Sequence, residues 1–262
     1  MSRIPLPDNE AHLWIVKTDD LHDPTLLEAY AELQTDQEKK RWKRYLVEPA
    51  RHQHLVARAL CRTTLSRYAE VDPVDWRFES GPKGKPFIAQ PSPDLDLRFN
   101  LSHTGGCIIC LVALGLEVGA DVENRERREP PLDIADRWFS PSEVHELRAL
   151  PHEHQLRRFF DYWTLKEAYI KARGLGLSLP LDQFSFDLTK PESIGIAFDP
   201  KLEDDPNRWQ FQRIDLGSRH PAAIAIERGD RPDLTLRLFP CTPLRDEGDS
   251  SDPPTKRDNS SR

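Results

Sequence analysis

Residues 159–171 read FFDYWTLKEAYIK, an aromatic stripe at helical spacing that is interrupted by charge. Its apolar residues share a helical face with Glu167 and Lys171. A carboxylate and an ammonium on a face that packs into a core cost free energy unless they are paired or line a site. The helix alone leaves two interpretations open, an i,i+4 ion pair at the rim of a core or a pair of site residues. The rest of the chain favours the site.

The composition is that of a globular protein with a charged surface, since 37% of the 262 residues are hydrophobic and 31% are charged. No apolar run is long enough to span a membrane. Residues 1–10 carry prolines and acids where a signal peptide needs an apolar core, so we expect a cytoplasmic protein. The net charge of -7 disfavours a general nucleic-acid binder, because affinity for a phosphate backbone requires a basic face.

The four cysteines are too few and too scattered for a disulfide framework. Cys107 and Cys110 form a C-x-x-C motif inside the apolar run 107–114, which is typical of a buried strand. Residues three apart on a strand face opposite sides. We therefore expect two small core residues and neither a metal nor a redox site.

The first part of the chain predicts helices with basic residues. Residues 35–38, TDQE, form a capping box that starts a helix carrying Lys40 and Arg41. A longer helix, expected at residues 50–68 after a proline, carries Arg51. For any one of these residues, a solvated helix face is the usual explanation.

Two loops rich in glycine and polar residues follow. Residues 81–86, GPKGKP, predict a tight loop whose glycines let the backbone approach another group closely. Residues 95–101 alternate as a half-buried strand does, and the strand ends in NLSHTGG at residues 100–106. A polar strand end with two glycines is a typical place for a ligand loop, although His103 alone would more often be structural.

The strand expected at residues 116–123 places Glu117, Asp121 and Glu123 on one face and apolar residues on the other. Asp121 and Glu123 would lie within roughly 7 Å of each other and would repel. An exposed sheet edge could screen the repulsion. A bound divalent cation would neutralise the repulsion directly, because Mg²⁺ is commonly held by carboxylates together with substrate phosphates.

The order of elements suggests the architecture. A capped helix, a long helix and an aromatic strand follow Thr35, and the same order follows Ser140 roughly a hundred residues later. We predict an α+β fold of two similar lobes with the active site in the cleft between them. The expected lobes are residues 12–115 and residues 116–240, the second with the metal site, and residues 241–262 are expected to be a disordered tail.

Four short motifs then occur in a fixed order: GKP at residues 84–86, FNLSH at 99–103, GADVE at 119–123 and WTLKEAYIK at 163–171. Over residues 13–239 the chain resembles the 4'-phosphopantetheinyl transferases of the surfactin-synthetase-activating (Sfp-like) type. The resemblance implies a pseudo-dimer of two α+β lobes. It also implies transfer of the phosphopantetheine arm of coenzyme A to a serine of an apo acyl or peptidyl carrier protein, with release of adenosine 3',5'-bisphosphate.

The resemblance implies a role for each matching residue. Asp121, Glu123 and Glu167 would hold Mg²⁺, which neutralises the charge growing on the leaving phosphate. Lys171 would add a cation at the phosphates. The base for the carrier serine stays open between Glu167, directly or through water, and Lys171. Lys166 is expected to point away from Glu167 and to have a packing role.

Coenzyme A should contact the first lobe mainly. Gly84, Lys85 and Pro86 match the adenine-contacting loop of the family, and Ser102 and His103 match its phosphate-contacting loop. The 3'-phosphate is expected to meet Lys40, Arg41 and Arg51, although Glu38 stands where the resemblance implies a cation.

Carrier proteins are acidic helical bundles, so the resemblance requires a basic, partly apolar surface beside the cleft. Arg125, Arg127 and Arg128 are candidates, although an exposed charged loop is the simpler interpretation. The two-lobed length is similar to that of transferases serving fatty acid, nonribosomal peptide and siderophore biosynthesis. We expect a monomer with no nucleic-acid or membrane partner.

Two other classes remain open at this stage. A metal-dependent phosphatase or nuclease could use the same carboxylates, but it would not need the loop at residues 84–86 and should hydrolyse its substrate. A non-catalytic module would bind coenzyme A or a carrier protein without depending on Mg²⁺.

Overall fold

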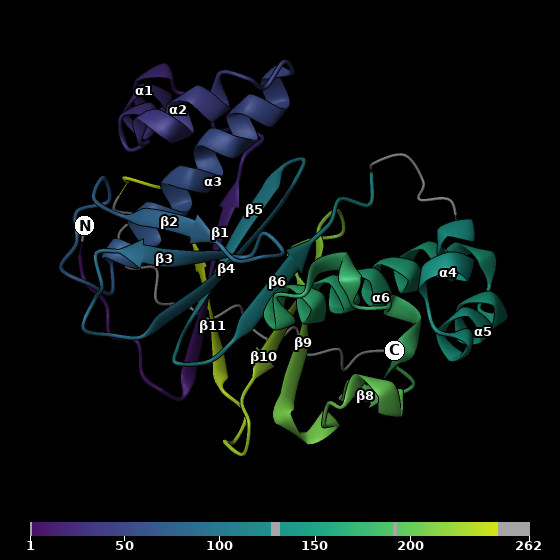
Figure 1. The fold of residues 1–262 in the computed structure, drawn as a ribbon. Helices are drawn as coiled ribbons and strands as arrows, with labels where there is room; N and C mark the ends of the chain where they lie inside the picture. Colours follow the sequence, from purple (N-terminus) through teal and green to yellow (C-terminus); the bar gives the residue numbers. More distant parts are fainter. Residues whose placement is uncertain (1, 127–131, 191–192, 246–262) are drawn as a thin grey trace, which may run out of the picture.

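The computed structural model describes residues 2–126, 132–190 and 193–245. The protein is built in four layers: helices, a first sheet, a second sheet and further helices (Figure 1). The α+β fold of two lobes that the sequence predicts is confirmed. Within the described part of the chain, no helix has the length and apolar character needed to cross a membrane.

The first lobe contains a four-stranded sheet. In pairing order its strands are β11 (Thr235–Pro240), β1 (Glu10–Lys17), β5 (Cys107–Leu114) and β4 (Leu97–Thr104). A separate hairpin consists of β2 (Arg77–Ser80) and β3 (Pro86–Gln90). The helices of this lobe are α1 (Pro24–Glu32), α2 (Asp36–Trp42) and α3 (Glu48–Ser66). The core beneath them joins α3 to one face of the sheet.

The second lobe contains a three-stranded antiparallel sheet. Its strands, in pairing order, are β6 (Val118–Val122), β10 (Pro221–Glu227) and β9 (Trp209–Asp215). A second hairpin consists of β7 (Phe184–Asp187) and β8 (Gly195–Phe198). The helices are α4 (Asp133–Trp138), α5 (Pro141–Ala149) and the long α6 (His152–Arg173), which packs on the outer face of this sheet.

The two sheets face each other across a third, fully apolar core. Alternate residues of β1 and β5 contribute to it from one side, and Val118, Ala120 and Val122 of β6 contribute from the other. Cys107 lies in this core, whereas Cys110 lies in the core under α3, and both are free thiols. The expectation of two small core residues on opposite faces is confirmed.

The helix ends follow the local sequence signals. Thr35 and Ser140 both form the capping boxes that the sequence predicts. Gly174 ends α6 in the left-handed conformation with φ 65°, which glycine adopts without a steric penalty. Helix α3 begins at Glu48 and not at residue 50, because Pro49 fits the first helical turn, where its missing N–H is not needed.

The end of the chain differs from the expected division into lobes. We expected residues 116–240 to form the second lobe, but β11 pairs in parallel with β1 and therefore completes the first sheet. The expected tail also starts too early. Residues 241–245 cover the first core, where the Tyr30 hydroxyl donates to the Pro243 carbonyl at 2.9 Å and Leu244 packs on apolar residues. Residues 246–262 lie outside the described residues.

Candidate active site

A glycine allows the two elements that carry the charged residues to meet. A Cβ at Gly119 would lie 2.0 Å from the Ala168 carbonyl oxygen and 2.4 Å from the Ala172 amide nitrogen. No side chain fits in this space, so α6 packs directly on the backbone of β6. Lys171, in the last turns of α6, therefore reaches the strand that carries Asp121.

Lys171 forms its ion pair with Asp121. The Lys171 Nζ lies 2.6 Å from Asp121 Oδ1 and also donates to Ser102 Oγ at 2.9 Å and to the Ala120 carbonyl at 3.2 Å. The Ser102 hydroxyl donates to the same Asp121 oxygen at 3.0 Å. The simple i,i+4 pair between Glu167 and Lys171 is therefore not the arrangement found; the ammonium binds a strand of the neighbouring sheet.

Glu167 lies one turn before Lys171 and is half-buried. Its pKa is raised to about 7, first by burial and then by the neighbouring carboxylate of Asp121; Lys171 lowers it, and Glu123 raises it slightly. The three carboxylates therefore share one electrostatic environment. A carboxyl group with a pKa near neutrality, lying in a cleft, is a candidate for proton transfer or cation binding.

The chemistry of these donors fits a hard cation. Asp121 Oδ2 is buried and has no hydrogen-bond partner among the described residues. An unpartnered, buried carboxylate oxygen costs free energy that a cation would recover. The three carboxylates do not converge, however: among the residues that the structure describes, no three His, Cys, Asp or Glu side chains are grouped as a metal site. Asp121, Glu123 and Glu167 thus remain a predicted ligand set.

A cavity of about 250 Å³ joins the two lobes at this point. From the first lobe it is lined by the Gly84–Lys85–Pro86 loop and by Asn100 and Leu101 of the FNLSH motif. From α6 it is lined by Glu167 and Lys171. Residues more than 80 positions apart in the sequence are thereby brought together. The cleft between lobes that the sequence predicts exists here.

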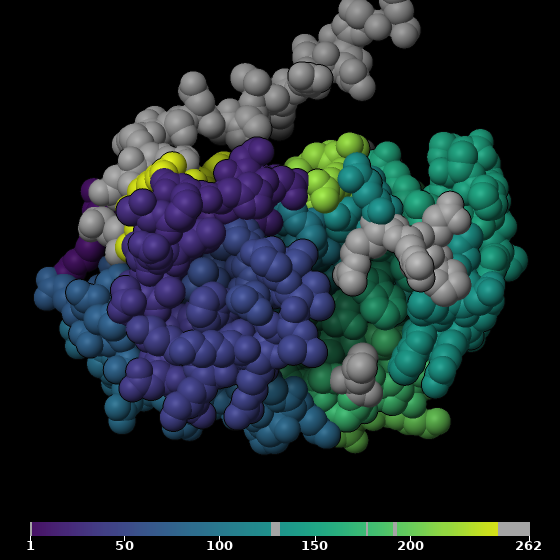
Figure 2. Space-filling view, turned by 90° about the horizontal axis from the view of Figure 1, so that it is seen from above, coloured from purple at the N-terminus to yellow at the C-terminus, as the bar shows by residue number. Residues whose placement is uncertain are grey.

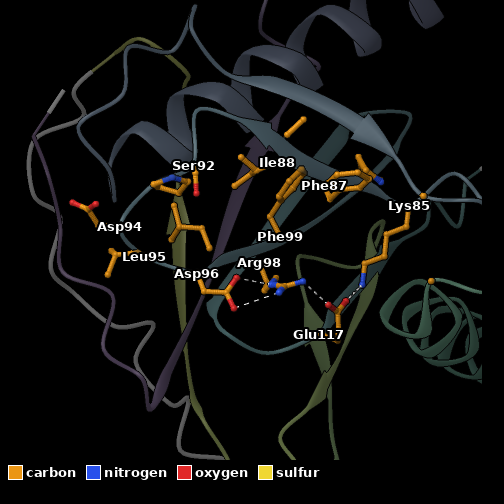
Figure 3. A pocket seen from close by; sticks show the side chains of 16 residues that line it. Lys85, Phe87, Ile88, Ser92, Asp94, Leu95, Asp96, Arg98, Phe99 and Glu117 are labelled. Atoms are coloured by element: carbon orange, nitrogen blue, oxygen red, sulfur yellow. Dashed lines mark hydrogen bonds and ion pairs between the residues drawn. The ribbon is translucent and has the colours of Figure 1, made fainter.

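Lys85 ties the two lobes together beside this cavity. Its Nζ lies 2.5 Å from Glu117 Oε2 and donates to the Ala172 carbonyl of α6 at 2.8 Å. Arg98 donates to the other oxygen of Glu117 at 2.9 Å. This ion-pair chain also forms one wall of a larger cavity, of about 670 Å³, between β3 and β4 (Figure 3). The ammonium of Lys85 is thus engaged within the protein, and its role toward adenine stays a prediction.

The two residues of the expected phosphate loop differ in their surroundings. Ser102 is buried, and its hydroxyl already contacts Asp121, Lys171 and the backbone amide of Val122. His103 is on the surface at the end of β4. Its pKa is lowered by desolvation and by the charge of Lys171. His103 is therefore the more accessible of the two.

The three basic residues expected at the 3'-phosphate are also in different settings. Lys40 and Arg41 are exposed on α2. Arg51 is partly buried, donates to the Tyr45 carbonyl at 2.9 Å and lies 5.9 Å from the ring centre of Trp42. Lys40 and Arg41 are free to approach a ligand, whereas Arg51 contributes to packing at the start of α3.

Sequence reasoning missed His54 beside the site and gave its neighbour Arg58 no specific role, although Arg58 is one of the basic residues available on the long helix. Burial and, after it, the charges of Arg58 and Arg41 together lower the pKa of His54 to about 4. Arg58 also lowers the pKa of His103. The signal was available in the sequence, because residues 51, 54 and 58 follow helical spacing on one face of α3.

Glu38 and Lys166 have structural roles. Glu38 closes the capping box of α2, and its carboxylate binds Arg62 at 2.5 Å and Arg58 at 3.7 Å, which explains an acid at this basic edge. Lys166 is fully buried 2.8 Å from Glu143, in the second core, as the expected packing role requires. Arg125, of the expected carrier contacts, lies 3.9 Å from Asp161; residues 127 and 128 lie outside the described residues.

Comparisons with known proteins give a consistent result over both lobes. The family model described as the 4'-phosphopantetheinyl transferase superfamily matches residues 117–225. A second model, described as the N-terminal part of 4'-phosphopantetheinyl transferase, matches residues 22–114.

Individual relatives match over most of their length. The 4'-phosphopantetheinyl transferase HetI of Nostoc sp. is 33% identical over 85% of this chain and 90% of its own. Sfp of Bacillus subtilis is 32% identical over 76% of this chain and 85% of its own. A phosphopantetheinyl transferase of Thraustochytrium sp. is 31% identical over 86% of this chain and 83% of its own. Because two family models and these relatives cover both lobes, the chain belongs to the 4'-phosphopantetheinyl transferase superfamily.

Proposed function

We propose that this chain transfers the phosphopantetheine arm of coenzyme A to a serine of an apo acyl or peptidyl carrier protein. The observation that carries the proposal is the cavity between the lobes, lined by the Gly84–Lys85–Pro86 loop on one side and by Glu167 and Lys171 on the other. In the reaction, the serine oxygen forms a bond to the phosphorus of the arm while the bond to the leaving phosphate breaks. Adenosine 3',5'-bisphosphate is released. Each chain supplies both lobes, so we expect a monomer to be active.

Asp121, Glu123 and Glu167 are proposed to hold Mg²⁺. The ion would supply charge neutralisation at the pyrophosphate. The two oxygens of Asp121 support this assignment, because one binds Lys171 and the other is buried without a partner among the described residues. One carboxylate can therefore contact the ammonium and a cation at the same time.

Glu167 is the better candidate for the base. Before a cation binds, its pKa is raised to about 7, so this carboxylate has a higher proton affinity than an ordinary glutamate, which suits proton transfer from a hydroxyl. The Lys171 Nζ already contacts three oxygens, which leaves it no free position from which to take the proton of a carrier serine. We assign Lys171 to neutralising phosphate charge.

The proposal is tested by the intact mass of an apo carrier protein after incubation with the chain, coenzyme A and Mg²⁺. We expect the carrier to gain the mass of one phosphopantetheine arm. Glu167→Gln should lose activity by orders of magnitude, because a charge at the reacting phosphates is removed. Glu153→Gln, an exposed position on the same helix, is the matched control and should act like the wild type.

The other function classes give distinct results in this assay. Consumption of coenzyme A without a mass gain on any acyl or peptidyl carrier would indicate a hydrolase. Binding of coenzyme A without turnover, and without dependence on Mg²⁺, would indicate a binding module. Either result would overturn the proposal.

A further inference from the structure

The turn between α2 and α3 presents two adjacent apolar side chains to solvent. Leu46 is 94% exposed and Val47 is 62% exposed, and no other described large hydrophobic residue reaches either value. Lys43 and Arg44, the two residues that precede Tyr45, are exposed as well. A single exposed leucine needs no explanation, but an adjacent apolar pair inside a basic segment has the composition of a contact surface.

A line of contacts connects this turn with the active site. The Tyr45 ring lies 5.1 Å from the His54 ring, measured between centres. Helix α3, which carries His54, packs against β4, where Ser102 contacts the Lys171 Nζ at 2.9 Å. The turn therefore lies on the first-lobe rim of the cleft.

The space-filling view agrees with this placement. Figure 2 shows a hollow between the two lobes, with the indigo α2–α3 segment as one wall and the teal helices of the second lobe as the other. Green atoms of the α6 region form its floor. A partner that delivers a side chain into this hollow would touch the α2–α3 wall.

We propose that residues 43–47 are a docking surface for the carrier protein, an inference that rests on the proposed function. Leu46 and Val47 contact apolar residues on a helix of the carrier, and Lys43 and Arg44 face its acidic side chains. The charge distribution favours this partner. The whole chain carries -7, so an acidic protein approaches only where basic residues are gathered. Such a gathering occurs at residues 39–44, KKRWKR.

Two other occupants fit the surface less well. A second copy of the chain would pair this turn with itself in a two-fold dimer, which would bring the two sets of basic side chains together. A membrane-bound helix needs a long apolar face, whereas the apolar part of this turn is two residues long.

The test is the double variant Leu46→Ser/Val47→Ser, assayed with saturating coenzyme A and a range of apo carrier concentrations. The KM for the carrier should rise roughly tenfold or more with little change in kcat, since exposed apolar anchors act in binding and not in chemistry. Calorimetric affinity for coenzyme A should be unchanged. The matched control is Val74→Ser/Leu95→Ser, which removes a second pair of exposed apolar side chains, 41% and 39% exposed.

A second variant tests the charges independently. Lys43→Glu/Arg44→Glu should also raise the KM for the carrier. The KM of this variant should depend less on salt than that of the wild type, because rim charges act mainly on the association rate. Its effect should fall on the carrier and not on the affinity for coenzyme A.

The inference is overturned if both variants keep the wild-type KM for the carrier. A loss of binding to vesicles containing an anionic phospholipid, or a change in mass by light scattering, with that KM unchanged, would reassign the turn to a membrane or to a second copy. If the wild type itself modifies no carrier, the proposed function has failed and the docking surface falls with it.

Discussion

Replacing Gly119 by alanine tests whether the active site depends on direct contact between β6 and α6. The added Cβ would lie 2.0 Å from the Ala168 carbonyl oxygen, whereas real Cβ atoms essentially never approach a neighbour closer than 3.0 Å. The helix must therefore retreat by at least about 1 Å, because both neighbours are backbone atoms that cannot rotate away. The same movement would stretch the 2.6 Å contact between Lys171 and Asp121 beyond hydrogen-bonding distance.

Two quantities should change together in Gly119→Ala. Overpacking of this kind costs about 1–3 kcal/mol in the free energy of unfolding, measured with urea. A misplacement of about 1 Å at the reacting groups lowers the rate roughly 100-fold, measured as transfer of the arm to an apo carrier. Gly81→Ala is the control, because its Cβ would meet the nearest atom at an ordinary 3.6 Å without a left-handed φ. Wild-type transfer and an unfolding free energy within about 0.5 kcal/mol would refute the reasoning.

Three further outcomes follow from the geometry. Glu117→Gln releases the Lys85 ammonium, which ties the GKP loop to α6. Because the pair is partly exposed, we expect at most about a fivefold higher KM for coenzyme A in steady-state kinetics. The exposed control Glu79→Gln should keep the wild-type KM. Lys166→Met leaves the carboxylate of Glu143 buried without its cation and should cost about 3–5 kcal/mol in urea unfolding, and a loss below about 1 kcal/mol would contradict a buried pair. The pKa of Glu167 is raised to about 7, so its carboxyl is protonated below that pH and a metal must displace the proton. Calorimetric Mg²⁺ affinity should therefore rise about tenfold from pH 6 to pH 8, and an affinity independent of pH would argue against Glu167 as a ligand.

Local signals in the sequence predicted the elements well. Capping at Thr35 and Ser140 depends on residues three positions apart, and the C-terminus of α6 depends on Gly174 alone. The strand that returns to the first sheet could not be predicted in this way. The pairing of β11 with β1 joins residues more than 200 positions apart, and no local pattern specifies which lobe a strand will complete.

The candidate site was predicted as a set of residues but not as a set of contacts. Helical spacing showed that Glu167 and Lys171 can meet on α6, and it could not show that β6 offers Lys171 a closer partner in Asp121. The same holds for Lys85. Its position in a loop does not predict that its ammonium binds the carboxylate of Glu117 and the Ala172 carbonyl at the end of α6. Long side chains find partners that only the packing of the lobes brings near.

The polar residues of the FNLSH motif have a structural role that cannot be inferred from their polarity alone. β4 and β6 are the edge strands of the two sheets, and the amides of β6 that face β4 need acceptors. The Asn100 side chain accepts from the Ala120 amide at 2.9 Å, and Ser102 Oγ accepts from the Val122 amide at 3.2 Å. These side chains replace a strand partner and fix the position of one lobe against the other. Because Ser102 also contacts both Asp121 and Lys171, the joint between the lobes and the centre of the site are the same group of atoms, so the geometry for phosphate chemistry depends on how the lobes are joined.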